Sequence, residues 1–307
     1  MPGTHETRTW RTPGGRYRAV LASVGLIALA TACSAPGTVP GSLGDAEGDR
    51  IRNTVGVALP EEARHVHGAG VDPETGEVLV ASHAGLYTLP APEEAGDGDV
   101  EPAHVGPEID LMGFAVQGPG HYLASGHPEG DTDMPDPVGL IETRDGGRSW
   151  EALSLAGESD FHALTSNDDR VFGFDGALRA TRDGVDWDDL DPSVQAFSLA
   201  VSDDGETVLA TTERGLLRST DGGADFEAVP DAPMPALVSW VRGGDRVFAI
   251  TLDGTVHLSE DAGLTWERTG ALPGTPEALY ADDEQVIVVA DLHVARSTDE
   301  GAGFDAW

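Results

Sequence analysis

Histidines are the residues of this chain best suited to chemistry, because imidazole is a common ligand for transition metals. Two of them stand in "RHVHGAG", where a single valine separates His65 from His67. His83, His127 and His162 also stand beside stretches with the composition of β-strands. We expect these five histidines to converge on one rim of the fold and to bind a ligand, with a transition metal such as copper or zinc as the leading candidate.

Methionine and aspartate accompany the histidines in strands that can be aligned with one another. Met112 stands where His67 and His162 stand in their own strands, and a thioether ligand would favour copper. Asp110 and Asp160 stand two residues earlier, where a carboxylate either binds a metal or orients an imidazole. The alternative is a channel lined by polar side chains that bind water and each other, since no HExxH or CxxC motif strengthens the metal prediction.

The same carboxylates allow a second kind of chemistry. Hydrolysis of a glycosidic bond needs two carboxyl groups roughly 5 to 10 Å apart, and Asp110 and Asp160 are the catalytic candidates on adjacent strands. Glu129 and Asp131 are further candidates in the proline-rich insertion at residues 127–137. We expect this insertion to lie over the mouth of the fold, where long loops are more often functional than random.

A short motif recurs five times and indicates how the strands are organised. "TRDGGRSW" returns as "TRDGVDW", "STDGGADF", "SEDAGLTW" and "STDEGAGF", with successive aspartates 38, 38, 40 and 38 residues apart. In such a turn the Ser or Thr and the Asp accept backbone N–H groups, Gly adopts a positive φ, and the closing aromatic residue is buried between sheets. We therefore predict structural roles for Asp145, Asp183, Asp221, Asp261, Asp299, Trp150, Trp187 and Trp266.

The motif resembles the Asp-box, also called the BNR repeat, a structural hairpin that joins the third and fourth strands of a propeller blade. The combination of "HVHG", "SHAGL", "LMGF", "ASGHP" and "DFHAL" looks like a group of bacterial BNR-repeat lipoproteins labelled glycosyl hydrolase or exo-sialidase-like. The resemblance spans residues 65–307 and implies a β-propeller. A sialidase needs three arginines around the substrate carboxylate, and the sequence places no arginine cluster near the histidines. We therefore favour a binding protein; if the chain is an enzyme, the resemblance implies a glycoside hydrolase.

Apolar and β-branched segments bounded by Gly and Asp predict strands throughout, and no long helical periodicity follows residue 33. The sequence therefore predicts an all-β fold, a β-propeller of six blades, with seven blades as the alternative. The segment "NTVGVAL" at residues 53–59 is expected to supply a missing strand and to close the ring. Inner strands are predicted near His65, Asp110, Asp160, Gln195, Leu237 and Glu277.

The N-terminal residues have the features of an export signal. Four arginines precede the apolar segment "AVLASVGLIALATA", which is short for a membrane span. The chain's one cysteine, Cys33, follows directly, as in the lipobox of bacterial lipoproteins. We expect residues 1–32 to be a lipoprotein signal peptide and Cys33 to be lipidated. Residues 33–50 are expected to form a flexible tether, and residues 51–307 the propeller.

The charge of the chain argues against two classes of partner. The 54 acidic and 18 basic residues give a net charge of −36, and every basic residue is arginine. Such a surface repels nucleic acid and anionic lipid headgroups, so contact with the membrane is expected through the N-terminal lipid only. We predict an extracytoplasmic, monomeric lipoprotein whose histidine-rich channel mouth binds a small ligand, a metal or an envelope protein. The alternatives are a glycoside hydrolase and a protein-interaction or assembly scaffold.

Overall fold

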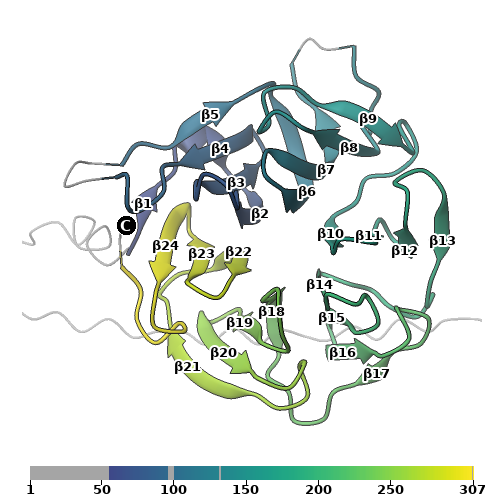
Figure 1. Ribbon diagram of the computed structural model, residues 1–307, viewed down its shortest axis with the longest axis vertical. Helices are drawn as coiled ribbons and strands as arrows, with labels where there is room; N and C mark the ends of the chain where they lie inside the picture. Colours follow the sequence, from purple (N-terminus) through teal and green to yellow (C-terminus); the bar gives the residue numbers. More distant parts are fainter. Residues whose placement is uncertain (1–54, 96–99, 131–132, 306) are drawn as a thin grey trace, which may run out of the picture. The chain divides into compact units, whose positions relative to one another are not determined.

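The computed structural model describes residues 55–95, 100–130, 133–305 and 307 of the chain. Their strands form six antiparallel sheets of four strands each, arranged as the blades of a β-propeller (Figure 1), which confirms the predicted all-β, six-bladed fold.

Each blade has four strands. The first blade comprises β2 (Val66–Val71), β3 (Val78–Ser82), β4 (Gly85–Leu89) and β5 (Ala103–Val105). The second comprises β6 (Ile109–Gly118), β7 (His121–Pro128), β8 (Leu140–Thr143) and β9 (Glu151–Ser154), and the third comprises β10 (Ala163–Ser166), β11 (Val171–Phe174), β12 (Leu178–Thr181) and β13 (Trp187–Asp189). The last three comprise β14 (Ser198–Val201), β15 (Val208–Thr212), β16 (Gly215–Ser219) and β17 (Glu227–Ala228); β18 (Pro235–Trp240), β19 (Val247–Thr251), β20 (Thr255–Ser259) and β21 (Glu267–Ala271); and β22 (Pro276–Ala281), β23 (Val286–Ala290), β24 (His293–Ser297) and β1 (Val57–Ala58). A short 3-10 helix, η1 (Glu61–Ala63), stands between β1 and β2.

Several sequence predictions concern residues outside the described part of the chain. They are the signal peptide over residues 1–32, the lipidation of Cys33, the tether that follows it, and the carboxylate of Asp131. Within the described residues, no helix has both the length and the apolar character that crossing a membrane requires.

The ring of blades is closed by pairing between two segments that are far apart in the sequence. β1 pairs with β24, with Val57 opposite Val294 and Ala58 opposite His293, and so becomes the fourth strand of the last blade. The sequence predicts this position for "NTVGVAL". The inner strands contact one another in the circular order β2, β6, β10, β14, β18, β22 and back to β2. Hydrogen bonds between the first and last described strands therefore hold the ring shut.

The second strand of each blade lies in the most buried part of the fold. β3 ("VLVAS") and β23 ("VIVVA") are buried at every residue, which explains why apolar and polar residues do not alternate along them. The tryptophans of the repeated motifs pack at the junctions between blades. Trp187, for example, joins a cluster that contains Leu140 of the second blade and Phe161 of the third. These clusters hold neighbouring blades together by burial of apolar surface.

The repeated motifs form the turns that follow the third strands of the second to sixth blades. Ser219 Oγ donates to Asp221 Oδ1 at 2.7 Å and accepts the N–H of Gly223 at 2.9 Å. Asp221 Oδ1 also accepts the backbone N–H groups of Ala224 and Asp225. Because the strands are antiparallel, these turns lie on the face opposite to the starts of the inner strands. The carboxylates of the motif are therefore used to fix turns away from the histidines.

The turn that contains Asp145 should make the stability of the protein depend on pH. Hydrogen bonds from the side chain and backbone of Ser149 lower the pKa of Asp145 from 3.8 to about 2. A lowered pKa in the folded protein contributes stability above pH 3.8, and this contribution is lost as the pH falls through about 2. Asp145→Ala should therefore lower the melting temperature at pH 7, and the difference from the wild type should vanish between pH 3.8 and about 2.

Circular dichroism melts at a series of pH values measure this difference directly. Asp186→Ala removes the same charge from an exposed position in another blade and is the matched control. A gap between Asp145→Ala and the wild type that stays constant down to pH 2 would contradict the assignment.

Candidate functional site: the histidine-rich channel mouth

A β-bulge near the start of four inner strands, β2, β6, β18 and β22, sets the direction of side chains at the channel mouth, and in β10 and β14 the equivalent residue lies in a bend directly before the strand. In β2, Val66 pairs with Ser82 and Gly68 pairs with Ala81, so His67 is an extra residue between them. A bulge breaks the alternation of a strand and re-aims the side chain of the extra residue. The equivalent residues of the other five blades are Met112, His162, Phe197, Ala236 and Glu277.

Four of these six residues meet at the entrance to the central channel. His67, His162, Phe197 and Glu277 line a common cavity of about 90 Å³. His67 and His162 thus line the same cavity, as the alignment of the inner strands predicts, although the two residues are 95 positions apart in the sequence. Met112 occupies the equivalent position of the second blade and is half-buried, but it does not line this cavity.

His65 takes a different place from the one that strand alternation predicts. It lies in the bend before β2 with its side chain exposed, and its carbonyl oxygen accepts the N–H of His83 at 3.0 Å. The rule that alternate residues share a face does not apply to His65 and His67, because one precedes the strand and the other is bulged. His65 therefore anchors the backbone of His83.

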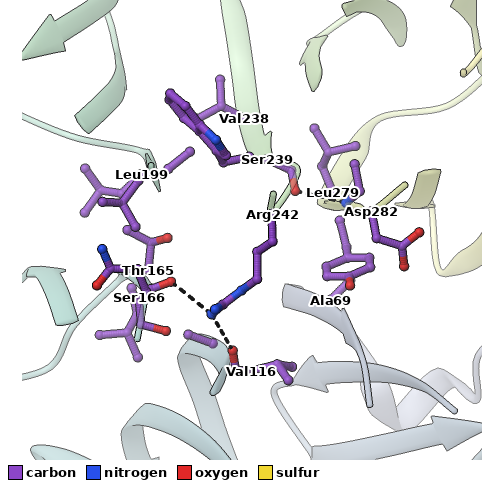
Figure 2. Close-up of a pocket in the computed structure, with 18 of the residues that line it drawn as sticks. Ala69, Val116, Thr165, Ser166, Leu199, Val238, Ser239, Arg242, Leu279 and Asp282 are labelled. Carbon is purple, nitrogen blue, oxygen red and sulfur yellow. Dashed lines mark hydrogen bonds between the residues drawn. The ribbon is translucent and has the colours of Figure 1, made fainter. Parts of the chain in front are cut away.

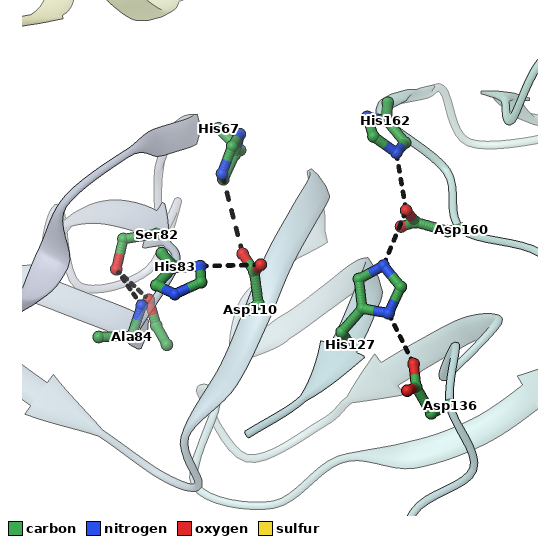
Figure 3. Close-up of polar contacts among 10 residues, drawn as sticks. His67, Ser82, His83, Ala84, Asp110, His127, Asp136, Asp160 and His162 are labelled. Atoms are coloured by element: carbon green, nitrogen blue, oxygen red, sulfur yellow. Dashed lines mark hydrogen bonds and ion pairs between the residues drawn. The ribbon is translucent and has the colours of Figure 1, made fainter. Parts of the chain in front are cut away.

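His83, Asp110 and Glu129 form the first polar group at the mouth. His83 directly follows β3, Asp110 lies in β6 and Glu129 directly follows β7, and their donor atoms lie within 4.8 Å of one another. His83 Nδ1 is 2.8 Å from Asp110 Oδ2, and His67 Nε2 is 3.8 Å from Asp110 Oδ1 (Figure 3). One imidazole and two carboxylates from the first two blades thus converge on one point, and His67 approaches the same carboxylate of Asp110 from the other side.

Asp110 has an oxygen that lacks a partner. The residue is only 9% exposed, and its Oδ1 atom is buried without a hydrogen-bond partner among the described residues. Leaving such a group unsatisfied costs about 1–3 kcal/mol or more. The neighbouring Gly126 (φ +145°) holds β6 and β7 close together here, because a Cβ on Gly126 would lie 1.8 Å from the carbonyl oxygen of Asp110. The close packing of β6 and β7 therefore holds the Asp110 carboxylate where one of its oxygens is buried without a hydrogen bond.

The second polar group links the second and third blades through a chain of alternating imidazoles and carboxylates (Figure 3). Asp160 Oδ2 is 2.7 Å from His162 Nε2 and 3.0 Å from His127 Nε2. The other ring nitrogen of His127, Nδ1, is 2.6 Å from Asp136 Oδ1. Because both nitrogens of His127 face carboxylates, this ring is suited to carry two protons and a positive charge. Asp160 Oδ1 is buried and has no partner within the described residues.

Three histidines at the mouth have pKa values that are shifted in different directions. Burial lowers the pKa of His67, and the nearby Asp110 only partly offsets this effect. The hydrogen bond to Asp136 raises the pKa of His127, and the hydrogen bond to Asp160 raises that of His162. The surroundings of His67 therefore stabilise its neutral ring, whereas those of His127 and His162 stabilise the protonated, ion-paired form.

The contacts with His162 and His127 also shift the pKa of Asp160. Burial opposes its ionisation, but the hydrogen bonds and charges of His162 and His127 outweigh that effect and leave the pKa of Asp160 below its ordinary value. A carboxylate of this kind accepts hydrogen bonds and pairs with imidazolium. It is poorly suited to donate a proton at neutral pH.

The structure gives three residues of the mouth contacts that the sequence does not predict. The sequence suggests Glu129 only as a hydrolytic carboxylate, yet Glu129 joins His83 and Asp110. It predicts no role for Asp136 or Glu277, although Asp136 pairs with His127 and Glu277 lines the cavity. The alignment of all six inner strands contained the signal for Glu277, because this residue occupies the bulge position of the last blade.

Comparison with known proteins shows likeness in fold but not in family. No protein-family model matches the chain. Among curated proteins, the vacuolar protein sorting/targeting protein 10 of Zygosaccharomyces rouxii is 30% identical over 105 residues, which make up 33% of this chain and 7% of that protein. The chain thus corresponds to a small part of this relative.

Solved structures that resemble the chain agree on the β-propeller. A chain of the nidogen/laminin complex has a TM-score of 0.59 at 11% identity and covers 74% of this chain and 91% of that one. A gluconolactonase from Xanthomonas campestris has a TM-score of 0.58 at 14% identity, with 77% and 86% covered. YCF48, solved with a D1 peptide, has a TM-score of 0.50 at 16% identity, with 82% and 86% covered. Identities this low show the fold alone.

Proposed function

We propose that the channel mouth binds one zinc ion through His83, Asp110 and Glu129, with His67 as the fourth ligand. The observation that carries this proposal is the buried, unpartnered Oδ1 of Asp110, which faces His67 at 3.8 Å while the other oxygen, Oδ2, is 2.8 Å from His83. A cation at this point would satisfy that oxygen and the lone pairs of the neighbouring rings. Binding would then relieve a cost that the protein otherwise bears.

The donor set favours zinc over copper. The group offers imidazole nitrogens and carboxylate oxygens, which zinc accepts at about 2.0–2.2 Å. A thioether would favour copper, but Met112 does not line the cavity of His67. The lowered pKa of His67 suits a metal ligand, because a neutral ring need not lose a proton before it binds. Small side-chain rotations would bring the donor atoms of His83, Asp110 and Glu129, which now lie within 4.8 Å of one another, onto one ion. His67, whose Nε2 is 3.8 Å from Asp110 Oδ1, would turn toward the same ion.

A glycoside hydrolase fits the geometry less well. Such an enzyme needs one carboxyl group that stays protonated at working pH, with a raised pKa. The pKa of Asp160 is shifted in the opposite direction, because its hydrogen bonds to His162 and His127 outweigh its burial. The carboxylate of Asp110 is engaged by His83 at 2.8 Å. Asp160 therefore lacks the surroundings of a general acid.

A protein-interaction module is the second candidate, and Phe197 is the observation that favours it. This side chain is 63% exposed at the mouth, although large apolar residues are usually buried. It borders a groove of about 670 Å³ that also contains Pro137 and Phe174. A failure of zinc binding would make this groove the first place to test for a peptide or protein partner.

Zinc titration of the purified, chelator-treated protein tests the proposed function. We expect one equivalent of zinc to bind, as measured by isothermal titration calorimetry and confirmed by elemental analysis. His121→Ala should bind zinc like the wild type, because His121 pairs with Glu142 at the opposite end of β7. Absence of binding, or loss of binding in His121→Ala, would refute this assignment of the site.

We also propose that the propeller is held at the membrane outside the cytoplasm by a lipid on Cys33. The support is the sequence alone: an arginine-rich start, an apolar segment and a cysteine directly after it. In cell fractionation, the wild type should sediment with membranes, and Cys33→Ser should move to the soluble fraction or remain unprocessed. Equal distribution of the two proteins would exclude the lipid anchor.

A further inference from the structure

The central channel has a second cavity at the end remote from the histidines (Figure 2). It has a volume of about 380 Å³ and lies where the inner strands end. Leu164, Leu199, Val238 and Leu279 line both this cavity and the smaller one at the mouth, so an apolar layer separates the two. The proposed zinc site does not use the larger cavity.

Carboxylates surround the entrance to this cavity. Asp203, Asp282, Asp283 and Glu284 all line it. Asp203 and Asp282 accept backbone N–H groups and so help to fix turns at the rim. Asp283 and Glu284 are exposed, and Asp283 Oδ1 is as far as 3.9 Å from Nη1 of Arg246. These two carboxylates are therefore free to meet a ligand.

Arg242 shows what kind of group this end of the channel accepts. Its guanidinium pairs with Asp168 at 2.8 Å and reaches across the opening to the carbonyl oxygens of Val116 and Ser166 at 3.5 and 3.4 Å (Figure 2). Contacts this long are weak. The opening thus holds a planar cation loosely, against carbonyl oxygens from two other blades.

Two aromatic side chains of the cavity can serve a ligand. Trp240 and Tyr280 also line the cavity, and aromatic faces attract cations. Four carboxylates against one guanidinium make the cavity repel anions.

We propose that this cavity binds a small organic cation of the amidine or guanidine class. The apolar body of the ligand would lie against Leu199, Val238 and Leu279. Its charged group would lie at the rim with Asp283 and Glu284. This site is independent of the zinc site, so each proposal stands or fails by itself.

Three probes of nearly equal shape and different charge test this inference. Benzamidine is a cation, benzamide is neutral and benzoate is an anion, and their binding to the full-length protein can be followed by NMR titration. We expect benzamidine to bind with a dissociation constant on the order of 1 mM, as suits so few atoms. Benzamide should bind at least about threefold more weakly, and benzoate should not bind.

Paired variants identify the carboxylates involved. Asp283→Asn/Glu284→Gln should weaken benzamidine binding about tenfold. Glu61→Gln/Glu62→Gln removes the same charge from an exposed pair in η1 outside the cavity lining, and should leave affinity unchanged. Equal affinity in both double variants would overturn the proposal. Because all four positions are exposed, unchanged melting temperatures are expected to show that the variants fold.

Arg242→Ala separates a cation site from an anion site. If the cavity binds cations, loss of this like charge should tighten benzamidine binding, by about threefold. If benzoate binds the wild type and Arg242→Ala abolishes that binding, the cavity is an anion site and the proposal is wrong. A benzamidine affinity that falls in Arg242→Ala would also count against it.

Discussion

Asp110→Asn should bind zinc at least about 100-fold more weakly than the wild-type protein, because it replaces a charged ligand by a poor neutral one. Loss of an outer hydrogen-bond partner of a metal ligand already costs about 10- to 100-fold in affinity, and loss of the ligand itself should cost no less. The substitution keeps the shape of the side chain. The calorimetric titration described above measures the change, with His83→Ala expected to show a loss of similar size.

The same variant also distinguishes a ligand from a structural residue. Asp110 Oδ1 is buried without a partner, so replacing the carboxylate by a neutral amide should leave the melting temperature of the metal-free protein unchanged or raise it. The increase in melting temperature that zinc causes in the wild type should disappear. A lower melting temperature with zinc binding retained would show that Asp110 supports the fold and is not a metal ligand.

Phe161→Ala should lower the free energy of unfolding by about 4 kcal/mol. The side chain is fully buried, and its ring stacks on Trp187 at a centroid distance of 4.7 Å between blades. Gly173 leaves room for this ring, since a Cβ there would lie 2.6 Å from Phe161 Cδ1. Truncation would therefore open a cavity that the surrounding strands cannot fill by collapse.

Phe197→Ala is the matched control for this substitution. The two phenylalanines both precede inner strands, but Phe197 is 63% exposed, so its removal should change stability by less than about 0.5 kcal/mol. Urea unfolding curves followed by fluorescence and circular dichroism give both values. Similar losses in the two variants would show that burial at the blade junction does not dominate the stability of this region.

Much of the fold follows from local patterns in the sequence. The turn motif needs only a few neighbouring residues to form, as the bonds from Ser219 and Asp221 show. Its recurrence every 38 to 40 residues sets the size of a blade, and the apolar runs between the turns set the number of strands. Six blades, and the closing of the ring by β1, follow from the sequence for this reason.

The candidate site was predictable only in part, because it depends on contacts between strands. Alignment of the inner strands by sequence brought His67 and His162 to one mouth, since equivalent residues of a repeat occupy equivalent places. The sequence did not indicate that His65 stays outside β2 or that Met112 misses the cavity. Both outcomes depend on bulges, whose position is set by pairing with the neighbouring strand.

The sequence by itself thus determined the repeat, the turn chemistry, the blade count and the end of the channel at which most of the histidines gather. The tertiary structure alone decided which side chains meet: His83 with Asp110 and Glu129, and His127 with Asp136 and Asp160. It also decided that Asp110 Oδ1 is buried without a partner. Local patterns record backbone preference over a few residues, whereas burial, orientation and charge pairing arise only when distant strands are packed together.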